Sequence, residues 1–259
     1  GSVARQYGQP YVLSETFGCS GWNTSIKDFL WIWGYQAVNG VNLPCLHLSA
    51  YSIRGIRKRD YPLFFSYQNS WWEDTALLTD GLKKIAGFLP PGTVRNHILV
   101  VSPIDSIWYN EGPETSIQSA KFSAQYRVLL ENLLDNQIGY DVGDPCLLER
   151  DGRVEEGRLC LGDGRYDMVF VSQTDFLTEA VERLLNSFME SGGRVVIVNE
   201  YVNGRPMHEE PPFLKKADVI MNRRSLVRKY FEAIGYTRAA QVEDNEGQIA
   251  RQIVVTHSE

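Results

Sequence analysis

The stretch YVLSETFGCSGWN, residues 11–23, decides how the first part of the chain is interpreted. With Pro10, its first residues form a short apolar run that predicts a buried β-strand over residues 10–14. Glu15 follows at the predicted strand end, and then comes a loop of glycine, small residues and aromatic residues. Such an acid can be directed into an enzyme pocket, and it can also simply cap a loop or form an ion pair. Both interpretations of Glu15 stay open at this point.

The residues up to the segment LPPG predict two β-α units. Ser25 and Asp28 have the spacing of a capping box, and Asn39-Gly40 is a typical helix end. The predicted elements after the first strand are a helix over 26–40, a strand over 41–48, an aromatic loop over 49–70 and a helix over 71–88. Both strands are apolar throughout, as in a parallel sheet that is buried on both faces. Two units cannot close a sheet, so we expect this region to be a piece of a larger assembly or to pack on the next domain.

The prolines and glycine at 90–92 mark a boundary, which predicts domains at 1–92 and 93–259. In the second domain, strands are predicted at 96–103, 166–172, 194–200 and 251–257, and helices at 116–137, 178–193 and 225–236. A hairpin is predicted within 152–166. This alternation of strands and helices predicts an α/β fold with a doubly wound, flavodoxin-like sheet.

The composition limits the possible classes of function. Hydrophobic residues make up 43% of the chain and charged residues 22%, which is typical of a soluble globular protein. The net charge of −6 argues against nucleic acid as a partner, and no apolar stretch is long enough to cross a membrane. The segment RGIRKRD, residues 54–60, is a local exception in charge. It is either an anion site or a solvated, salt-bridged loop.

No residue pattern indicates a metal or a cofactor. The four cysteines have neither metal-ligand nor redox spacing, so we expect reduced and mostly buried thiols, and the four histidines are scattered. The second domain has no glycine-rich phosphate loop, and its turn VSQTDFL has no cysteine nucleophile. We therefore expect this domain to be catalytically silent. A small-molecule or nucleotide binder of the flavodoxin type is a weaker alternative.

Candidate site residues lie in the first domain. Glu15 and His47 are at or near the ends of two consecutive strands, which would present an acid and an imidazole to one face, as at the carboxyl ends of barrel strands. His47 taken alone is better explained as a structural residue. The adjoining loops carry four further candidates for substrate binding: Trp22, Asn23, Tyr51 and Arg54. Aromatic residues make up 12% of the chain and are densest in its first third, which suits flat ligands such as sugar rings.

Three segments in order, VLSETFGCSGWN, GYQAVNGVNLPCLHLSAYSIRGIRKRDYP and FSYQNSWWED, resemble the C-terminal part of the catalytic barrel of large bacterial glycoside hydrolases. They look related to the α-L-rhamnosidases of family 106 and, more distantly, to clan A barrels such as β-galactosidases. The resemblance covers about residues 10–90. It implies that the two strands are the seventh and eighth of a (β/α)8 barrel. It also implies that Glu15 is the nucleophile of a retaining enzyme or the base of an inverting one.

Residues 93–205 resemble the class I glutamine amidotransferase-like domain that follows the barrel in such enzymes, comparable to the trimerisation domain of family 42 β-galactosidases. The segment VEEGRLCLGDGRYDMVFVSQTDFLTEAVERLLNSFMESGGRVVIV carries this resemblance. Six barrel strands, including the one that would supply the partner carboxylate, have no counterpart in the sequence. The chain is therefore expected to be a fragment of a carbohydrate-active hydrolase that is inactive alone.

A non-enzymatic oligomerisation or interaction module is the alternative function. The expected partners are a carbohydrate, for the parent protein, and further copies of the chain through the α/β domain. No cofactor and no metal are expected. The expected location is cytoplasmic, or else unknown, because the natural N-terminus is expected to be missing.

Overall fold

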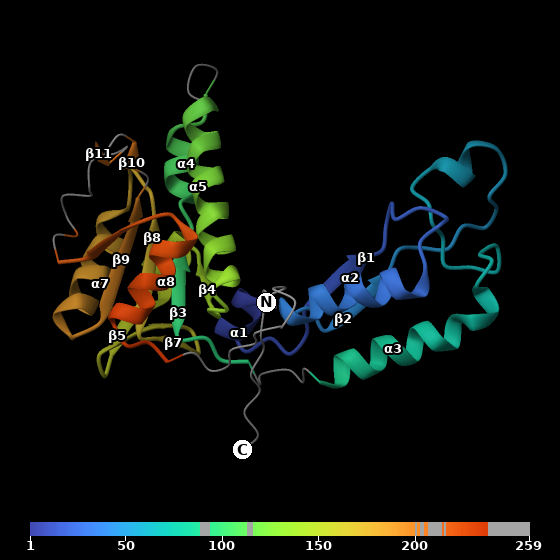
Figure 1. The fold of residues 1–259 in the computed structure, drawn as a ribbon, viewed down its shortest axis with the longest axis horizontal. Helices are drawn as coiled ribbons and strands as arrows, with labels where there is room; N and C mark the ends of the chain where they lie inside the picture. The colour runs from blue at the N-terminus through green and yellow to red at the C-terminus, as the bar shows by residue number, and fades with distance from the viewer. Residues whose placement is uncertain are drawn as a thin grey trace. The chain divides into compact units, whose positions relative to one another are not determined.

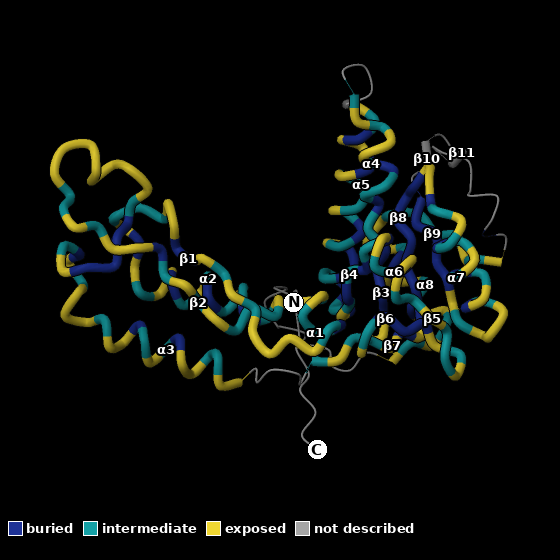
Figure 2. Tube along the Cα trace, turned by 180° about the vertical axis from the view of Figure 1, so that it is seen from behind, coloured by how far each residue is buried: buried dark blue, intermediate teal, exposed yellow. Residues whose placement is uncertain are grey.

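The structure is a computed structural model, and it describes residues 1–88, 94–112, 116–199, 201–202, 205–206, 214 and 216–237. The chain divides into two compact units (Figure 1). Gly8–Val94 forms most of the first unit, and Ser2–Tyr7 belongs with Arg95–Val255 in the second. Each unit has its own apolar core (Figure 2). The attachment of the N-terminal residues to the second unit is not visible in the sequence pattern.

The first unit is built on two parallel strands, β1 (Leu13–Thr16) and β2 (Leu43–Leu46). Its helices are α2 (Ile26–Val38) and α3 (Thr75–Gly87), with short 3-10 helices at Gly55–Arg59 and Trp72–Asp74. The predicted capping box at the start of α2 is confirmed, since the Ser25 and Asp28 side chains each bond to the other residue's backbone N–H.

A cluster of aromatic and aliphatic side chains holds α2 and α3 together. Phe29 and Trp33 of α2 are fully buried, as is Leu78 of α3. The Trp33 indole N–H donates a hydrogen bond to the Leu82 carbonyl oxygen at 3.1 Å, so the polar atom of this large side chain is satisfied inside the core. The two helices therefore share one packed core.

Only one face of the β1–β2 sheet is covered. Thr16 is buried, and its hydroxyl donates to the Gln36 side-chain oxygen of α2 at 2.5 Å. On the opposite face, Leu13 and Leu43 are 61% and 41% exposed. The expectation that both strands are buried on both faces is therefore wrong. No helix among the described residues of this unit covers the second face, so its apolar side chains stay accessible.

The second unit contains a five-stranded sheet in the order β12-β9-β8-β3-β4, in which every pair of neighbours is parallel. The strands are β3 (Ile98–Val101), β4 (Asp141–Gly143), β8 (Met168–Ser172), β9 (Arg194–Asn199) and β12 (Asp218–Met221). Numbered along the chain, this order is 2-1-3-4-5, the order of flavodoxin-like sheets. The three central strands are buried along nearly their whole length (Figure 2).

Helices cover both faces of this sheet (Figure 1). One face packs on α5 (Ser116–Asp135) and α8 (Arg224–Ala233), and the other on α6 (Pro145–Asp151) and α7 (Glu179–Glu190). The remaining elements are α1 (Ser2–Gln6), α4 (Ile104–Tyr109), the antiparallel strands β5 (Gly152–Glu155), β6 (Arg158–Leu161) and β7 (Gly164–Tyr166), and the pair β10 (Tyr201–Val202) and β11 (Arg205–Pro206).

The sequence pattern predicted β3, β8 and β9 but missed β4 and β12. Both missed strands are short, and each begins with an aspartate. They are strands because they pair with β3 and β9, not because of their own composition. The helices α4 and α6 were also missed, because no element was predicted over these short segments. The strand predicted over 251–257 lies outside the described residues.

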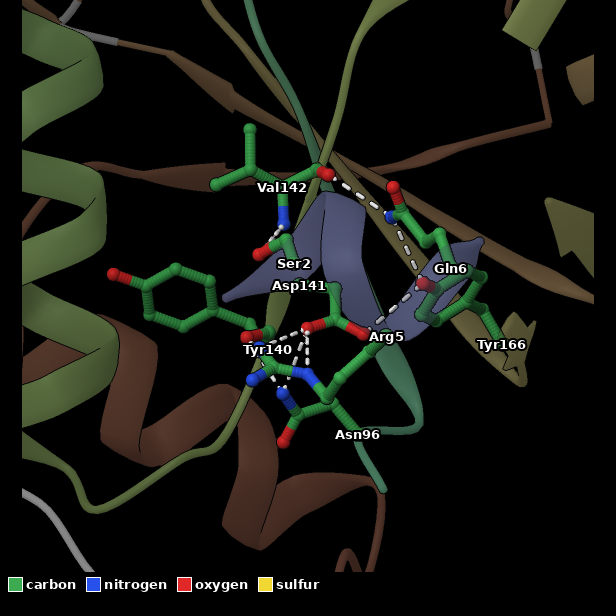
Figure 3. Close-up of polar contacts among 8 residues, drawn as sticks. All are labelled: Ser2, Arg5, Gln6, Asn96, Tyr140, Asp141, Val142 and Tyr166. Carbon is green, nitrogen blue, oxygen red and sulfur yellow. Dashed lines mark hydrogen bonds and ion pairs between the residues drawn. The ribbon is translucent and has the colours of Figure 1, made fainter. Parts of the chain in front are cut away.

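Asp141, at the start of β4, connects α1 to the sheet (Figure 3). It is only 3% exposed. One carboxylate oxygen accepts from Arg5 Nε at 2.9 Å, from Nη2 of the same guanidinium, and from Asn96 Nδ2 at 3.0 Å. The second oxygen accepts from the Tyr166 hydroxyl at 3.1 Å. A buried carboxylate is tolerated here because each oxygen has a donor.

The same corner of the unit satisfies its neighbouring polar groups (Figure 3). Gln6 Nε2 lies 3.0 Å from both the Val142 carbonyl oxygen and the Tyr166 hydroxyl, and the Val142 amide donates to the Ser2 hydroxyl. Burial and the adjacent Asp141 carboxylate raise the pKa of Tyr166, which keeps the hydroxyl protonated as a donor. The helix α1 therefore caps one edge strand of the sheet.

Arg5→Ala tests whether this corner stabilises the second unit. The change leaves the buried Asp141 charge without its cation, so we expect a loss of about 3 kcal/mol in the free energy of unfolding of the unit. Hydrogen exchange of the β3 and β8 amides measures this loss. Arg158→Ala is the matched control, because it breaks an exposed pair with Asp167 and should cost less than about 1 kcal/mol. Equal effects of the two substitutions would contradict the assigned role of Asp141.

Candidate functional site

The parallel pairing of β1 and β2 brings Glu15 and His47 together. Glu15 pairs with Cys45, and the His47 amide, one residue beyond β2, donates to the Thr16 carbonyl oxygen at 2.8 Å. The distance from Glu15 Oε1 to His47 Nε2 is 3.7 Å. The sequence predicted that Glu15 follows the end of the strand. In the structure β1 runs on to Thr16, so Glu15 lies inside the strand. Strand alternation directs Glu15 away from α2, toward the open face of the sheet.

Glu15 and His47 have different environments. The Glu15 side chain is 61% exposed, whereas the His47 side chain is 11% exposed. The pair is therefore not a buried structural ion pair, because its acid is free to meet a ligand. His47 Nδ1 is buried and has no hydrogen-bond partner among the described residues. The imidazole is therefore held mainly by packing. Its Nε2 atom is the one that faces the Glu15 carboxylate.

Gly18 is part of this packing. A Cβ atom at position 18 would lie 3.0 Å from Cδ2 of His47, closer than ordinary van der Waals contact. The backbone around it is unusual, because Phe17 and Cys19 have φ angles of 73° and 59°. Leu48, directly after His47, has a φ of 38°. Left-handed backbone at non-glycine residues is costly and tends to gather at functional sites. Here it lies immediately beyond both strands.

The four other candidate residues lie on the loops of the same unit. Trp22 is partly buried; its indole N–H donates to the Lys58 carbonyl oxygen at 2.6 Å, and its ring meets Phe64 edge-on at 5.9 Å. Asn23 and Arg54 are exposed, and Tyr51 is fully exposed. No hydrogen bond or ion pair between described residues joins any of the four to Glu15 or His47. The structure thus assembles the acid and the imidazole, and among the described residues it shows no hydrogen bond or ion pair from either to the four loop residues.

The sequence pattern did not indicate that Cys45 lies beside Glu15, and the thiols are more exposed than expected. Cys45 sits beside Glu15 in the sheet and is exposed, as are Cys19 and Cys146, while Cys160 is buried. The expectation of mostly buried thiols is wrong because Cys45 lies on the uncovered face, where alternation from Leu43 would have placed it. Burial raises the pKa of the Cys160 thiol, which keeps it protonated and unreactive.

Three further observations concern a basic segment, metal-binding groups and membrane-spanning helices. The basic side chains of residues 54–59 are exposed, and none of them forms an ion pair with a described residue. Among the described residues there is no group of three or more His, Cys, Asp or Glu side chains that could hold a metal ion. No helix in the described ranges is long and apolar enough to span a membrane.

The parallel sheets with their helices give the chain an α/β fold of the kind found in glycoside hydrolases. Its structure is similar to that of a rhamnosidase from Novosphingobium sp. PP1Y, with a TM-score of 0.60 and 18% sequence identity over 94% of this chain and 24% of that one. At this identity the likeness concerns the fold alone. The chain spans about a quarter of the length of the rhamnosidase that it matches.

Two β-galactosidases show weaker structural similarity to the chain. A GH42 β-galactosidase from G. stearothermophilus has a TM-score of 0.48 and 13% identity, over 66% of this chain and 24% of that one. A β-galactosidase from the psychrophilic Marinomonas ef1 has a TM-score of 0.46 and 12% identity, over 74% of this chain and 29% of that one. No family profile and no curated protein matches the sequence.

Gly18→Ala tests the packing that places His47. We expect the new methyl group to displace the imidazole and shift its ring proton resonances in NMR spectra. Gly34→Ala is the matched control, because a Cβ at this position in α2 meets nothing within 4 Å. The control should leave the His47 resonances unchanged and stabilise the helix by about 1 kcal/mol. Unchanged His47 resonances in Gly18→Ala would show that the glycine has no part in placing the ring.

Proposed function

We propose that this chain is part of a glycoside hydrolase and that Glu15 is one of its two catalytic carboxylates. The observation that carries the proposal is the exposed Glu15 carboxylate on the open face of a parallel strand pair, 3.7 Å from an imidazole held by packing. The fold likeness to a rhamnosidase over 94% of the chain supports it. A rhamnoside is therefore the first substrate class to test.

In this proposal, β1 and β2 are two neighbouring strands of a (β/α)8 barrel, the seventh and eighth. Helices cover the outside of such a barrel, and the inner strand faces are filled by side chains from the other strands. The first unit fits this division, since α2 packs on the Thr16 face and the opposite face exposes Leu13 and Leu43. Glu15 would then point into the barrel at the end where barrel enzymes carry their active sites.

The second unit is, in the same proposal, a class I glutamine amidotransferase-like domain without amidotransferase chemistry. Its strand order of 2-1-3-4-5 with helices on both faces supports a doubly wound domain of this general kind. Neither cysteine of this unit favours a nucleophile. Cys160 is buried in β6 of the antiparallel sheet. Cys146 is exposed at the start of α6, just beyond β4, but desolvation and the charges of Asp144, Asp105 and Glu149 raise the pKa of its thiol.

The chemistry requires a second carboxyl group. Retaining enzymes place the two carboxyl groups about 5–5.5 Å apart and inverting enzymes about 6.5–9.5 Å apart. We infer that the partner is supplied by sequence outside this chain. Glu15 would act as nucleophile or base, and His47 would orient it through the Nε2 edge. Trp22 and Tyr51 would stack on the sugar, while Asn23 and Arg54 would bond its hydroxyls.

Glu15→Gln in the complete open reading frame that encodes this chain tests the proposal. The amide cannot act as nucleophile or base, so we expect the rate of aryl rhamnoside cleavage to fall at least about 100-fold. Glu73→Gln is the control, because Glu73 is an exposed acid of the same unit in the turn before α3. Activity close to that of the unaltered protein in Glu15→Gln would remove Glu15 from catalysis. The chain by itself should show no turnover, and turnover would mean that both carboxylates lie within it.

A non-enzymatic assembly role is the second candidate for the α/β unit. Trp108 of α4 is 65% exposed and Ile117 of α5 is 71% exposed, and these two helices contact each other. If the two side chains belong to one contiguous apolar patch, that patch would be a candidate interface. We expect the mass of the chain measured by light scattering to rise with concentration and Trp108→Ser to reduce that rise. A constant monomer mass across concentrations would argue against this role.

A further inference from the structure

The carboxyl edge of the five-stranded sheet, between β3 and β8, has features that the proposed glycosidase chemistry does not use. In the strand order 2-1-3-4-5, the connections from these two neighbouring strands lead to opposite sides of the sheet. Ligands of open α/β sheets bind in the crevice outside such a switch point. Here the segments that leave the two strands are the start of α4 and residues 173–178.

Two buried oxygen acceptors at this edge have no hydrogen-bond partner among the described residues. They are Oδ2 of Asp105, in the first turn of α4, and Oε1 of Gln173, directly after β8. Gln173 is only 4% exposed. Leaving such a group unpaired costs free energy, so each case calls for an explanation.

Strand geometry indicates that both groups lie over the same face of the sheet. Val169 and Val171 of β8 pack in the core cluster that includes Leu148 of α6, and Gln173 follows at the same two-residue alternation. Asp105 interacts electrostatically with Asp144, the N-cap residue of α6, and with Glu149, which lies within α6. The Gln173 acceptor is therefore directed to the side of the edge where the carboxylates gather.

The carboxylates at this edge lack positive partners. Asp105, Asp144 and Glu149 form no ion pair with any described Lys, Arg or His residue. Burial raises the pKa of Asp105, and the charges of Asp144 and Glu149 add to this effect. The site therefore has an excess of negative charge. Asp144 Oδ1 accepts from the first amides of α6, and Glu149 Oε2 accepts from the Thr178 hydroxyl, so the unpaired acceptors are those of Asp105 and Gln173.

Two backbone amides at this edge are already paired within the protein. The Ser106 hydroxyl oxygen accepts from the Asp175 and Phe176 amides at 3.1 and 3.0 Å, and it also bonds the Thr174 hydroxyl. A phosphate at this switch point could not use these two amides. The edge consequently favours a ligand that brings its own donors and positive charge.

Aromatic rings lie one helical turn from Asp105. Tyr109 stands four residues further along α4 and stacks on Phe176, with ring centroids 6.0 Å apart and planes inclined by 11°. The two side chains are 76% and 43% exposed. Aromatic faces beside carboxylates attract flat organic cations.

We propose that this edge binds a small organic cation with a planar N–H donor group, such as an amidinium or guanidinium. Asp105 and the Gln173 side-chain oxygen accept its hydrogen bonds, Asp144 and Glu149 add attraction, and the Tyr109–Phe176 pair receives its flat apolar part. A metal ion is a poorer fit, since the described residues offer no group of three metal-binding side chains here. The site is in the second unit and does not depend on the proposed role of Glu15.

Isothermal titration of the chain with benzamidine, compared with its uncharged analogue benzamide, tests this proposal. We expect benzamidine to bind and benzamide to bind at least about tenfold more weakly, because the charge-assisted hydrogen bonds are lost. Asp105→Asn should weaken benzamidine binding about tenfold, and Gln173→Met about fivefold. Asp163→Asn is the control, since it removes one negative charge from the β6–β7 turn and should change nothing.

The variants also separate binding from folding. The raised pKa of Asp105 means that its contribution to stability is greatest when it is protonated and is lost as the pH rises through the folded-state pKa. Asp105→Asn should therefore raise the melting temperature at neutral pH while it weakens binding. The absence of benzamidine binding, equal binding of benzamide, or unchanged binding by Asp105→Asn would each overturn the proposal.

Discussion

The register between β1 and β2 is the constraint on which the candidate site depends. Parallel pairing of Glu15 with Cys45, followed by the bond from the His47 amide to Thr16, puts an acid and an imidazole at one end of one sheet face. A shift of one residue would turn Glu15 toward α2 and into the aromatic core. The fully buried Trp33 and the hydrogen bond between Thr16 and Gln36 oppose such a shift.

The two units differ in how many faces of their parallel sheets are covered. The second unit buries both faces of its sheet under helices, so its central strands are apolar along their length (Figure 2). The first unit covers one face only and leaves Leu13 and Leu43 accessible. An uncovered face of a parallel sheet is unusual, because parallel strands are normally protected on both sides. This incompleteness supports the proposal that the first unit is a part of a larger barrel.

Within the second unit, the carboxylates at the two edges of the sheet differ in their hydrogen bonding. At the amino edge, Asp141 is buried and receives donors from Arg5, Asn96 and Tyr166 (Figure 3). At the carboxyl edge, Asp105 has a buried oxygen without a donor and lies near two further acids. The first arrangement is complete as a structural contact. The second is incomplete, which is the physical basis for expecting a ligand there.

The sequence by itself determined the elements whose signals are local. Continuous apolar runs predicted β3, β8 and β9, and the spacing of Ser25 and Asp28 predicted the start of α2. Two neighbouring strands were predicted to present Glu15 and His47 to one face, although Glu15 lies within β1 and not at its end. Tertiary structure alone decided β4, β12, the docking of α1 and the exposure of Leu13 and the thiols. The physical reason is that these features depend on cross-strand partners and on which element covers a face. Local hydrophobic periodicity does not reveal the cross-strand partner of a segment or the element that covers its face.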